Sequence, residues 1–328
     1  MNSTNNIDGP INPLFVEYTN KNEYFRSCLF ISAFIFGIIA FFVYVLLQLN
    51  IALRKYYITI KSNTGILIAL ASFFEILHQI SHIIFLIKII FFGMDFIPYK
   101  QSLLILTPSM IGVFGVIFMF ITLSIDRLLA ILIPITYRNF KQLYYIIIQV
   151  FFILIYVIYG LFIMYMAKIL TPNWMITGFI GDLFTAPLNM NLYYSNSCIT
   201  IFAIIIYLII GILIKFKTDT TDERIKKMYL SLFLIIFVNI GGYLICNVSY
   251  AILVHSSIIK VTPVNIWFWC NFSAIFLNIA AASIGPILYI NSGEYKLAFN
   301  RAFTNINNTL TGICFFGFTV SNVTYFFI

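Results

Sequence analysis

Charged side chains are scarce in this sequence. Asp, Glu, Lys and Arg make up 9% of its 328 residues, whereas hydrophobic residues make up 62%. A soluble domain of this length needs a largely polar surface, so the composition excludes one. Cysteine is also rare, with five residues, which excludes a disulfide-held secreted scaffold. The mean hydropathy of +1.00 indicates a protein of the lipid bilayer.

Catalytic and nucleotide-binding motifs are missing as well. The sequence has no HExxH zinc motif and no glycine-rich phosphate loop, and its three histidines leave little from which to build a metal site. The inverted repeats with broken spans that mark many transporters are not found either. We therefore expect no enzymatic activity, no cofactor and no bound metal.

Long apolar runs dominate what is present. A membrane span needs about 20 mainly apolar residues, and the sequence predicts an all-α membrane protein, a seven-transmembrane helix bundle over residues 27–290. An N-terminal segment, residues 1–26, precedes it. A short amphipathic helix on the membrane surface is expected at 291–303, followed by a tail at 304–328. The predicted spans are 27–49, 63–90, 102–125, 144–167, 198–214, 229–254 and 265–290.

The distribution of basic residues predicts the orientation. Of the 19 Lys and Arg, 13 fall in the segments on the side of the C-terminus and six on the other side. Cytoplasmic loops carry the excess of positive charge, so we expect an extracellular N-terminus and a cytoplasmic C-terminus in the plasma membrane. The formal net charge of +8 then reflects loops beside anionic lipid, and no nucleic-acid partner is expected.

The inner end of the third predicted span carries the most specific motif, SIDRLLAILIPITYR, residues 124–138. Asp126 and Arg127 can reach the headgroups there, so one interpretation is an ordinary interfacial anchor. The acid–Arg pair, followed at fixed spacing by Pro134 and Tyr137, resembles the third-span signature of rhodopsin-like G-protein-coupled receptors. The stretch is most similar to nematode serpentine chemoreceptors of the Srsx class.

The resemblance extends over the seven spans, with departures. GPILY in the seventh span matches the family's Asn-Pro-x-x-Tyr at Pro286 and Tyr289 but has Gly285 in place of Asn. YLICNVS in the sixth span matches Phe-x-x-Cys-Trp-x-Pro at Tyr243, whereas Asn247 replaces Trp and the proline is missing. The missing proline puts the usual kink of this span in doubt.

The resemblance implies a switch at the inner end of the bundle. Asp126 would hold Arg127 in the resting receptor, and activation would release Arg127 toward a heterotrimeric G protein. The hydroxyls of Tyr207 and Tyr289 would then hold the released Arg127, and Pro134 would dock on the G protein.

Two lysines at the inner end of the sixth span, Lys226 and Lys227, are open to two interpretations. They are either solvated cytoplasmic charges or contacts to the G protein. The residues assigned to the switch and to coupling are Asp126, Arg127, Pro134, Tyr137, Tyr207, Lys226, Lys227, Pro286 and Tyr289.

A polar face crosses the second predicted span. Glu75, His78 and His82 follow at i, i+3 and i+7 and so share one side of a helix. Ionisable groups inside a membrane mark functional sites by default, and three interpretations are open: hydrogen bonds between helices, a ligand pocket, or a zinc site. A zinc site would need further ligands, and the remaining histidine, His255, falls near the last outer loop.

The ligand class can be narrowed by counting helical turns. Ser109 lies five turns before Arg127, about 27 Å higher on the same face, where amine-binding receptors of the resembled superfamily carry Asp. We therefore expect a small, weakly polar ligand rather than an amine. The alternative is that the aromatic residues, Trp267 and Trp269 included, are core or interfacial residues. The expected pocket residues are Glu75, His78, His82, Ser109, Met110, Val113, Phe114, Tyr243, Asn247, Trp267 and Asn271.

Modification sites are few. Asn2 opens an NST glycosylation sequon on the outer side. Cys28 and Cys270 lie near the outer ends of the first and last spans and would form a disulfide if these spans are neighbours; free apolar thiols are the alternative. Ser102 stands near the place of the first Cys of the disulfide that joins the third span to the second outer loop in the resembled family. Cys314 is a candidate palmitoylation site in the tail.

Three functions are compatible with the sequence. The predicted one is a G-protein-coupled chemosensory receptor, single or paired as a dimer, with membrane lipid around it; the nematode resemblance implies a sensory cilium. The second is a seven-span ligand-gated cation channel of the insect odorant-receptor kind, whose N-terminus lies inside. The third is a metal-using membrane enzyme or transporter that depends on Glu75, His78 and His82.

Overall fold

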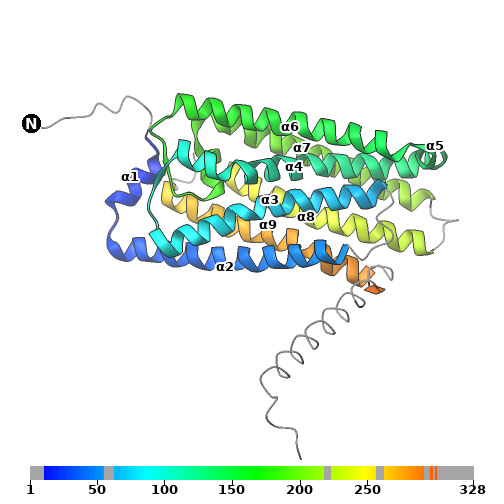
Figure 1. Ribbon diagram of the computed structural model, residues 1–328, viewed down its shortest axis with the longest axis horizontal. Helices are drawn as coiled ribbons and strands as arrows, with labels where there is room; N and C mark the ends of the chain where they lie inside the picture. The colour runs from blue at the N-terminus through cyan, green and yellow to red at the C-terminus, as the bar shows by residue number, and fades with distance from the viewer. Residues whose placement is uncertain are drawn as a thin grey trace, which may run out of the picture.

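The computed structural model describes residues 11–54, 63–217, 223–255, 262–291, 296–297 and 300. Within them, long helices lie side by side as one elongated bundle (Figure 1), which confirms the predicted all-α architecture. In lipid, a helix satisfies every backbone hydrogen bond internally, and this is why each apolar run forms one. The long helices are α2 (Glu23–Arg54), α3 (Asn63–Phe92), α4 (Tyr99–Leu132), α6 (Gln142–Leu170), α7 (Met190–Lys217), α8 (Glu223–His255) and α9 (Pro263–Asn291).

Six helices within the described residues are long and apolar enough to cross a membrane. Of the long helices, α8 is not among these six, but it packs along α9. Most helices extend beyond the predicted spans; α7, for example, begins at Met190, eight residues before the predicted start. Loss of hydropathy marks the edge of the hydrocarbon region, whereas the helix itself continues into the headgroup layer.

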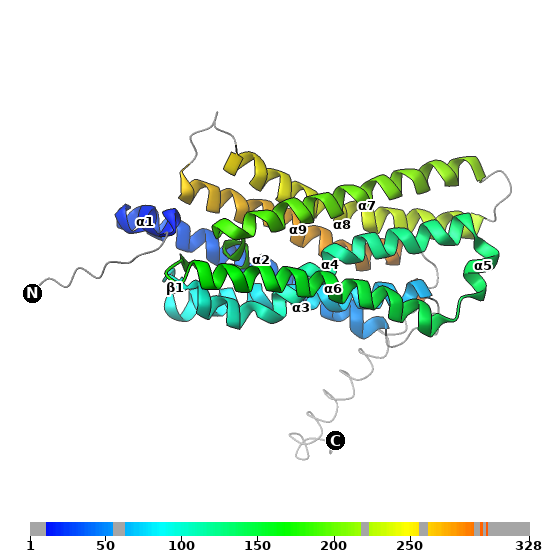
Figure 2. The same ribbon diagram turned by 90° about the horizontal axis from the view of Figure 1, so that it is seen from above.

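Short elements close the two ends of the bundle. At one end lie α1 (Pro13–Asn20) and a two-stranded antiparallel ladder of β1 (Ile97–Pro98) and β2 (Met175–Ile176), and α5 (Pro134–Asn139) lies at the other (Figure 2). The loop after β2 continues as two 3₁₀ turns, η2 (Ile180–Thr185) and η3 (Pro187–Asn189). We call β1, β2, η2 and η3 the outer cover.

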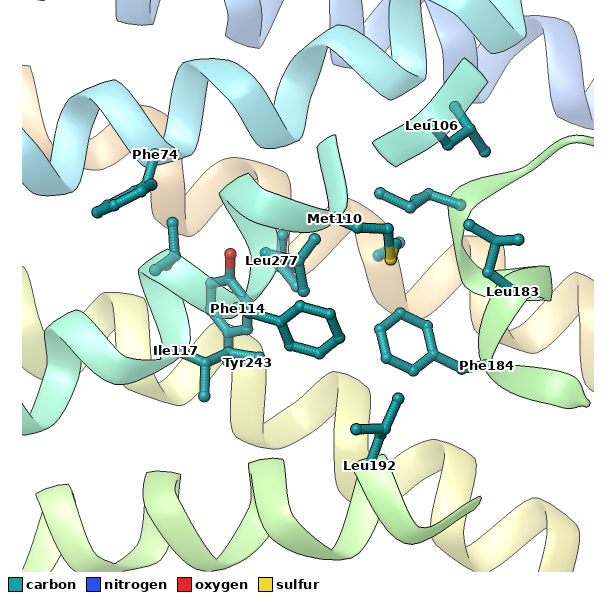
Figure 3. Close-up of a cluster of buried hydrophobic side chains, with 14 of the residues drawn as sticks. Phe74, Leu106, Met110, Phe114, Ile117, Leu183, Phe184, Leu192, Tyr243 and Leu277 are labelled. Atoms are coloured by element: carbon teal, nitrogen blue, oxygen red, sulfur yellow. The ribbon is translucent and has the colours of Figure 1, made fainter. Parts of the chain in front are cut away.

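Helix α4 forms the centre of the bundle and packs against α3, α6 and α7. Its glycines let α3 approach closely, because a Cβ at Gly112 would lie 2.4 Å from the backbone nitrogen of His78. The buried cluster around α4 also reaches the outer cover: Phe114 meets the ring of Phe184 edge to face, with 6.2 Å between centroids (Figure 3). Helix α6 instead exposes many large apolar side chains, as expected of a lipid-facing helix.

Candidate functional site: an inner charge cluster and an outer cavity

The carboxylate of Asp126 is fully buried and accepts hydrogen bonds from four side chains. Arg127 donates to Oδ2 through Nη2 at 2.7 Å and Nε at 3.1 Å. Thr64 Oγ1 donates to the same oxygen at 2.9 Å. The hydroxyls of Tyr137 and Tyr145 donate to Oδ1 at 2.6 Å and 3.0 Å. We call these five residues the inner cluster.

The inner cluster joins four helices. Thr64 is the second residue of α3, Asp126 and Arg127 lie near the end of α4, Tyr137 is on α5 and Tyr145 is near the start of α6. A buried ion pair is tolerated when further hydrogen bonds satisfy the remaining lone pairs, and here they do. Burial, followed by the charge of Asp126, raises the pKa of Tyr137 on α5 to about 12, which keeps this hydroxyl protonated as a donor.

The other described residues predicted for the switch lie on α5, α7 and α9. Tyr207 on α7 is buried, and its hydroxyl has no hydrogen-bond partner among the described residues. Pro134 is the exposed first residue of α5. Pro286 and Tyr289 lie in the last turns of α9, where the Lys296 ammonium is 5.9 Å from the centroid of the Tyr289 ring.

A cavity of about 280 Å³ lies toward the opposite end of the bundle. Residues of α3, α4, α7, α8 and α9 form its walls, and α1 and the outer cover contribute to its lining. Part of this lining was predictable from the sequence. The predicted residues that line the cavity are His78, His82, Val113, Tyr243, Asn247 and Trp267.

Five other predicted pocket residues do not line the cavity. Met110 and Phe114 are fully buried in the hydrophobic core (Figure 3), and Ser109 is fully buried beside them on α4. For the three residues on α4, the reason is that this helix is central, so other helices cover positions that a count of turns assigns to a pocket. The five residues are Glu75, Ser109, Met110, Phe114 and Asn271.

Glu75 contacts a neighbouring side chain instead of the cavity. Its Oε2 lies 3.5 Å from Nδ1 of His78. The hydroxyl of Tyr243 on α8 lies 3.2 Å from the same His78 nitrogen and 3.5 Å from Glu75 Oε1. The polar face of α3 thus serves both a helix–helix contact and the cavity wall.

The two histidines of this face are close to each other, with 5.3 Å between ring centroids. His82 is buried, and neither of its ring nitrogens has a hydrogen-bond partner among the described residues. The same part of the chain contains no group of three or more His, Cys, Asp or Glu side chains able to hold a metal ion.

The outer cover is tied to the head of α4 by hydrogen bonds. The backbone N–H of Tyr99 donates to the carbonyl of Trp174 at 2.8 Å, directly beside the β1–β2 ladder. The side-chain amide of Asn189 donates to the Tyr99 hydroxyl at 2.8 Å. Tyr99 lies one helical turn before Ser102, the residue found near the position of the first disulfide cysteine in the resembled superfamily.

Asp182 holds the outer cover in its folded shape. Its Oδ2 accepts bonds from the backbone N–H of Thr177 at 2.9 Å and from the Thr177 hydroxyl at 2.5 Å. Burial raises the pKa of Asp182 to about 6, although the bonds from Thr177 and the charge of Lys88 oppose the shift. Asp182 also lines the cavity. Asp182 could not be assigned to the cavity from the sequence, because an irregular loop has no hydrophobic periodicity to show which side chains face inward.

Helix α1 covers the cavity from the N-terminal side. Asn12 caps the helix through Oδ1, which accepts from the Leu14 N–H at 2.9 Å, and its Nδ2 donates to the carbonyl of Met175 at 2.6 Å. Glu17 accepts a bond from the backbone N–H of Val264 at 2.9 Å. The segment expected to be a simple N-terminal extension therefore contributes to the site.

Of the two alternatives for Cys28 and Cys270, the structure has the free thiols and not the disulfide. Helices α2 and α9 are neighbours, but Cys28 is exposed on α2, whereas Cys270 is partly buried and lines the cavity. Both thiols are free.

Several predicted positions lie outside the described residues. These are Asn2, Cys314, most of the surface helix at 291–303, and the side chains of Lys226 and Lys227.

The comparisons with known proteins agree with this architecture. A family model described as serpentine type 7TM GPCR chemoreceptor Srsx matches residues 34–303. The match extends from α2 through the inner cluster and the outer cavity to the end of α9. No curated protein matches the chain. Because the family model covers most of the sequence, the chain belongs to the Srsx family of serpentine seven-transmembrane chemoreceptors.

Proposed function

We propose that the protein binds a small, weakly polar ligand in the outer cavity and activates a heterotrimeric G protein through the inner cluster. The observation that carries this proposal is the buried carboxylate of Asp126, which ties α3, α4, α5 and α6 together at the end of the bundle opposite the cavity. Helices α3 and α4 contribute to both places, through His78 and Val113 in the cavity and Thr64 and Asp126 in the cluster.

The proposed mechanism is a shift between two states of the bundle. The hydrogen bonds of the inner cluster hold Arg127 against Asp126 in the resting state. The cavity walls are arranged differently in the two states. A ligand that binds the active arrangement more tightly shifts the equilibrium toward the active state, by as much as its affinities for the two states differ. In the active state Arg127 leaves Asp126, and the Tyr207 hydroxyl, which has no hydrogen-bond partner among the described residues, accepts a bond from it.

The cytoplasmic contacts and the location complete the proposal. Pro134 on the exposed face of α5, together with Lys226 and Lys227, contacts the G protein. The N-terminus, α1 and the outer cover face the outside of the cell, in keeping with the excess of basic residues at the other end. Plasma membrane, including that of a sensory cilium, is the proposed location.

Nucleotide exchange on a panel of G-protein α subunits tests the mechanism. Membranes would carry equal surface amounts of wild type, Asp126→Asn, Arg127→Ala and the matched control Asp95→Asn, whose side chain is exposed beyond the outer end of α3. We expect Asp126→Asn to raise basal exchange, Arg127→Ala to lower it, and the control to equal wild type. If Asp126→Asn and Arg127→Ala both equal wild type on an α subunit that the receptor activates, the inner cluster is only structural.

A further inference from the structure

The walls of the outer cavity limit both the size and the charge of its ligand. A volume of about 280 Å³ is roughly nine times the 30 Å³ share of one water, which leaves room for a molecule of about ten non-hydrogen atoms. Most walls are apolar, among them Val113, Ile117 and Leu277. The described lining includes no Lys, Arg or Glu, and its one acidic residue is Asp182.

Several hydrogen-bond acceptors of the lining are already engaged. Asp182 accepts two bonds from Thr177, and Asn196 Oδ1 accepts from the Tyr156 hydroxyl at 2.5 Å. His78 is taken up by its contacts with Tyr243 and with Glu75, which lies behind the wall. A carboxylate ligand would find no Lys or Arg in the described lining, and the one carboxylate that an ammonium ligand could meet, Asp182, already accepts two hydrogen bonds at Oδ2.

Two donors of the lining, in contrast, are free. The indole N–H of Trp267 and the amide Nδ2 of Asn247 are buried and have no hydrogen-bond partner among the described residues. The Trp267 indole also acts on Asp182 and lowers the pKa of that carboxyl, but no hydrogen bond of good geometry joins the two side chains. Buried polar groups almost always have partners, so two free donors on neighbouring helices indicate an acceptor that enters from outside.

We propose that the ligand is a small neutral carbonyl compound, a ketone, aldehyde or ester, whose oxygen accepts hydrogen bonds from Trp267 Nε1 and Asn247 Nδ2. A carbonyl oxygen has two lone pairs and needs no acceptor in return, which fits this pair of donors. Neutral His82, with one donor and one acceptor nitrogen, adapts to a second polar group of the ligand. The inference rests on the proposed function, because it takes this cavity as the ligand site.

The test is a binding screen on the purified full-length receptor, with the ligand-induced shift in thermal unfolding as readout. The library holds ketones, aldehydes, esters, alcohols, amines, carboxylic acids and hydrocarbons of about ten non-hydrogen atoms. We expect carbonyl compounds to bind most tightly. Trp267→Phe and Asn247→Leu should each weaken them about five- to tenfold, as loss of one hydrogen bond does. Trp269→Phe, on the exposed side of α9, is the matched control and should leave binding unchanged.

The outcomes separate this inference from the proposed function. A preference for amines, acids or alcohols, or carbonyl binding that survives Trp267→Phe and Asn247→Leu unchanged, overturns the carbonyl assignment alone. Ile117→Trp, which fills the cavity, should abolish binding of every class. Binding that persists in Ile117→Trp, or no binding by any compound to the folded receptor, rejects the cavity as the ligand site and both proposals with it.

Discussion

Single buried polar groups affect both the stability and the conformational state of this receptor, because each needs hydrogen-bond partners that lipid cannot supply. Asp126 has four donor residues around it, whereas Tyr207 has no partner among the described residues. A buried hydrogen bond contributes about 1 kcal/mol, and leaving its acceptor unpaired costs about 1–3 kcal/mol. Substitutions at such groups should therefore change both stability and the balance between states.

Tyr145→Phe removes one donor from Asp126 without changing the shape of the side chain. We expect the free energy of unfolding to fall by about 1 kcal/mol and basal nucleotide exchange to rise, since the resting arrangement loses a bond. Thermal unfolding and exchange assays measure the two effects. Tyr144→Phe is the matched control, because the neighbouring Tyr144 is exposed. Equal behaviour of the two variants would show that the Tyr145 bond contributes nothing.

Asp182 gives the outer cover a pH dependence. Its pKa is raised by burial from 3.8 to about 6, so the folded protein holds the proton more tightly than the unfolded chain. This contribution to stability is complete below pH 3.8 and is lost as pH rises to about 6. The loss is at most about 3 kcal/mol, from about two pKa units at about 1.4 kcal/mol each.

Asp182→Asn should remove this dependence, because the amide oxygen can still accept from Thr177 but does not titrate. Unfolding midpoints measured from acidic to neutral pH would then fall more steeply with pH in wild type than in the variant. Asp95→Asn should keep the wild-type profile, as Asp95 is exposed. Parallel profiles for wild type and Asp182→Asn would contradict the role given to this carboxylate.

The residues of the candidate site were only partly predictable. His78, His82 and Asn247 are polar residues inside apolar runs, and this contrast is visible in the sequence. Thr64 and Tyr145 belong to the inner cluster only because α3 and α6 meet α4 at that depth, which no local pattern encodes. Similarly, the rotation of α4 about its axis places Ser109 in the core, away from the cavity.

At the scale of elements, the bilayer makes the long helices predictable from the sequence, whereas the short helices, strands and turns are not. Each apolar run of sufficient length must form a helix in lipid, so the six described helices that are apolar enough to cross a membrane follow from hydropathy. The two-residue strands, the 3₁₀ turns and the eight-residue α1 are too short for any period to appear. Their positions depend on tertiary contacts, such as the Asn12 bond to Met175.

The close contact of α3 and α4 depends on Gly112. A Cβ at this position would lie 2.4 Å from the His78 nitrogen and 2.6 Å from the Phe74 carbonyl oxygen, and backbone atoms cannot move aside easily. We expect Gly112→Ala to lower the free energy of unfolding by about 1–3 kcal/mol. Surface abundance and thermal unfolding measure the effect.

Gly241 on α8 supplies the matched control for that prediction. No atom lies within 4 Å of a Cβ built there, and alanine is the better helix former. Gly241→Ala should therefore leave stability unchanged or raise it by a few tenths of a kcal/mol to about 1 kcal/mol. If both alanine variants lose stability equally, close packing of α3 on α4 is not the cause.

At the scale of the whole molecule, the two ends of the bundle differ in charge and in structure. One end carries α1, the outer cover and the cavity, and the other carries α5, the inner cluster and most of the Lys and Arg. We expect an epitope at the N-terminus to be stained by antibody on intact cells and one at the C-terminus only after permeabilisation. The reverse pattern would contradict the receptor orientation and favour the seven-span channel class.

Hydrogen bonds hold the outer cover in place, so the receptor should tolerate reducing conditions. The four cysteines within the described residues are free thiols, and the contacts of Tyr99, Asn189 and Asp182 hold the cover in place. A reducing agent acts by thiol–disulfide exchange, and the described part of the outer cover contains no disulfide bond for it to cleave. Dithiothreitol should therefore leave the ligand response intact, and the receptor should mature without oxidative folding enzymes, which opens simple expression hosts to its study.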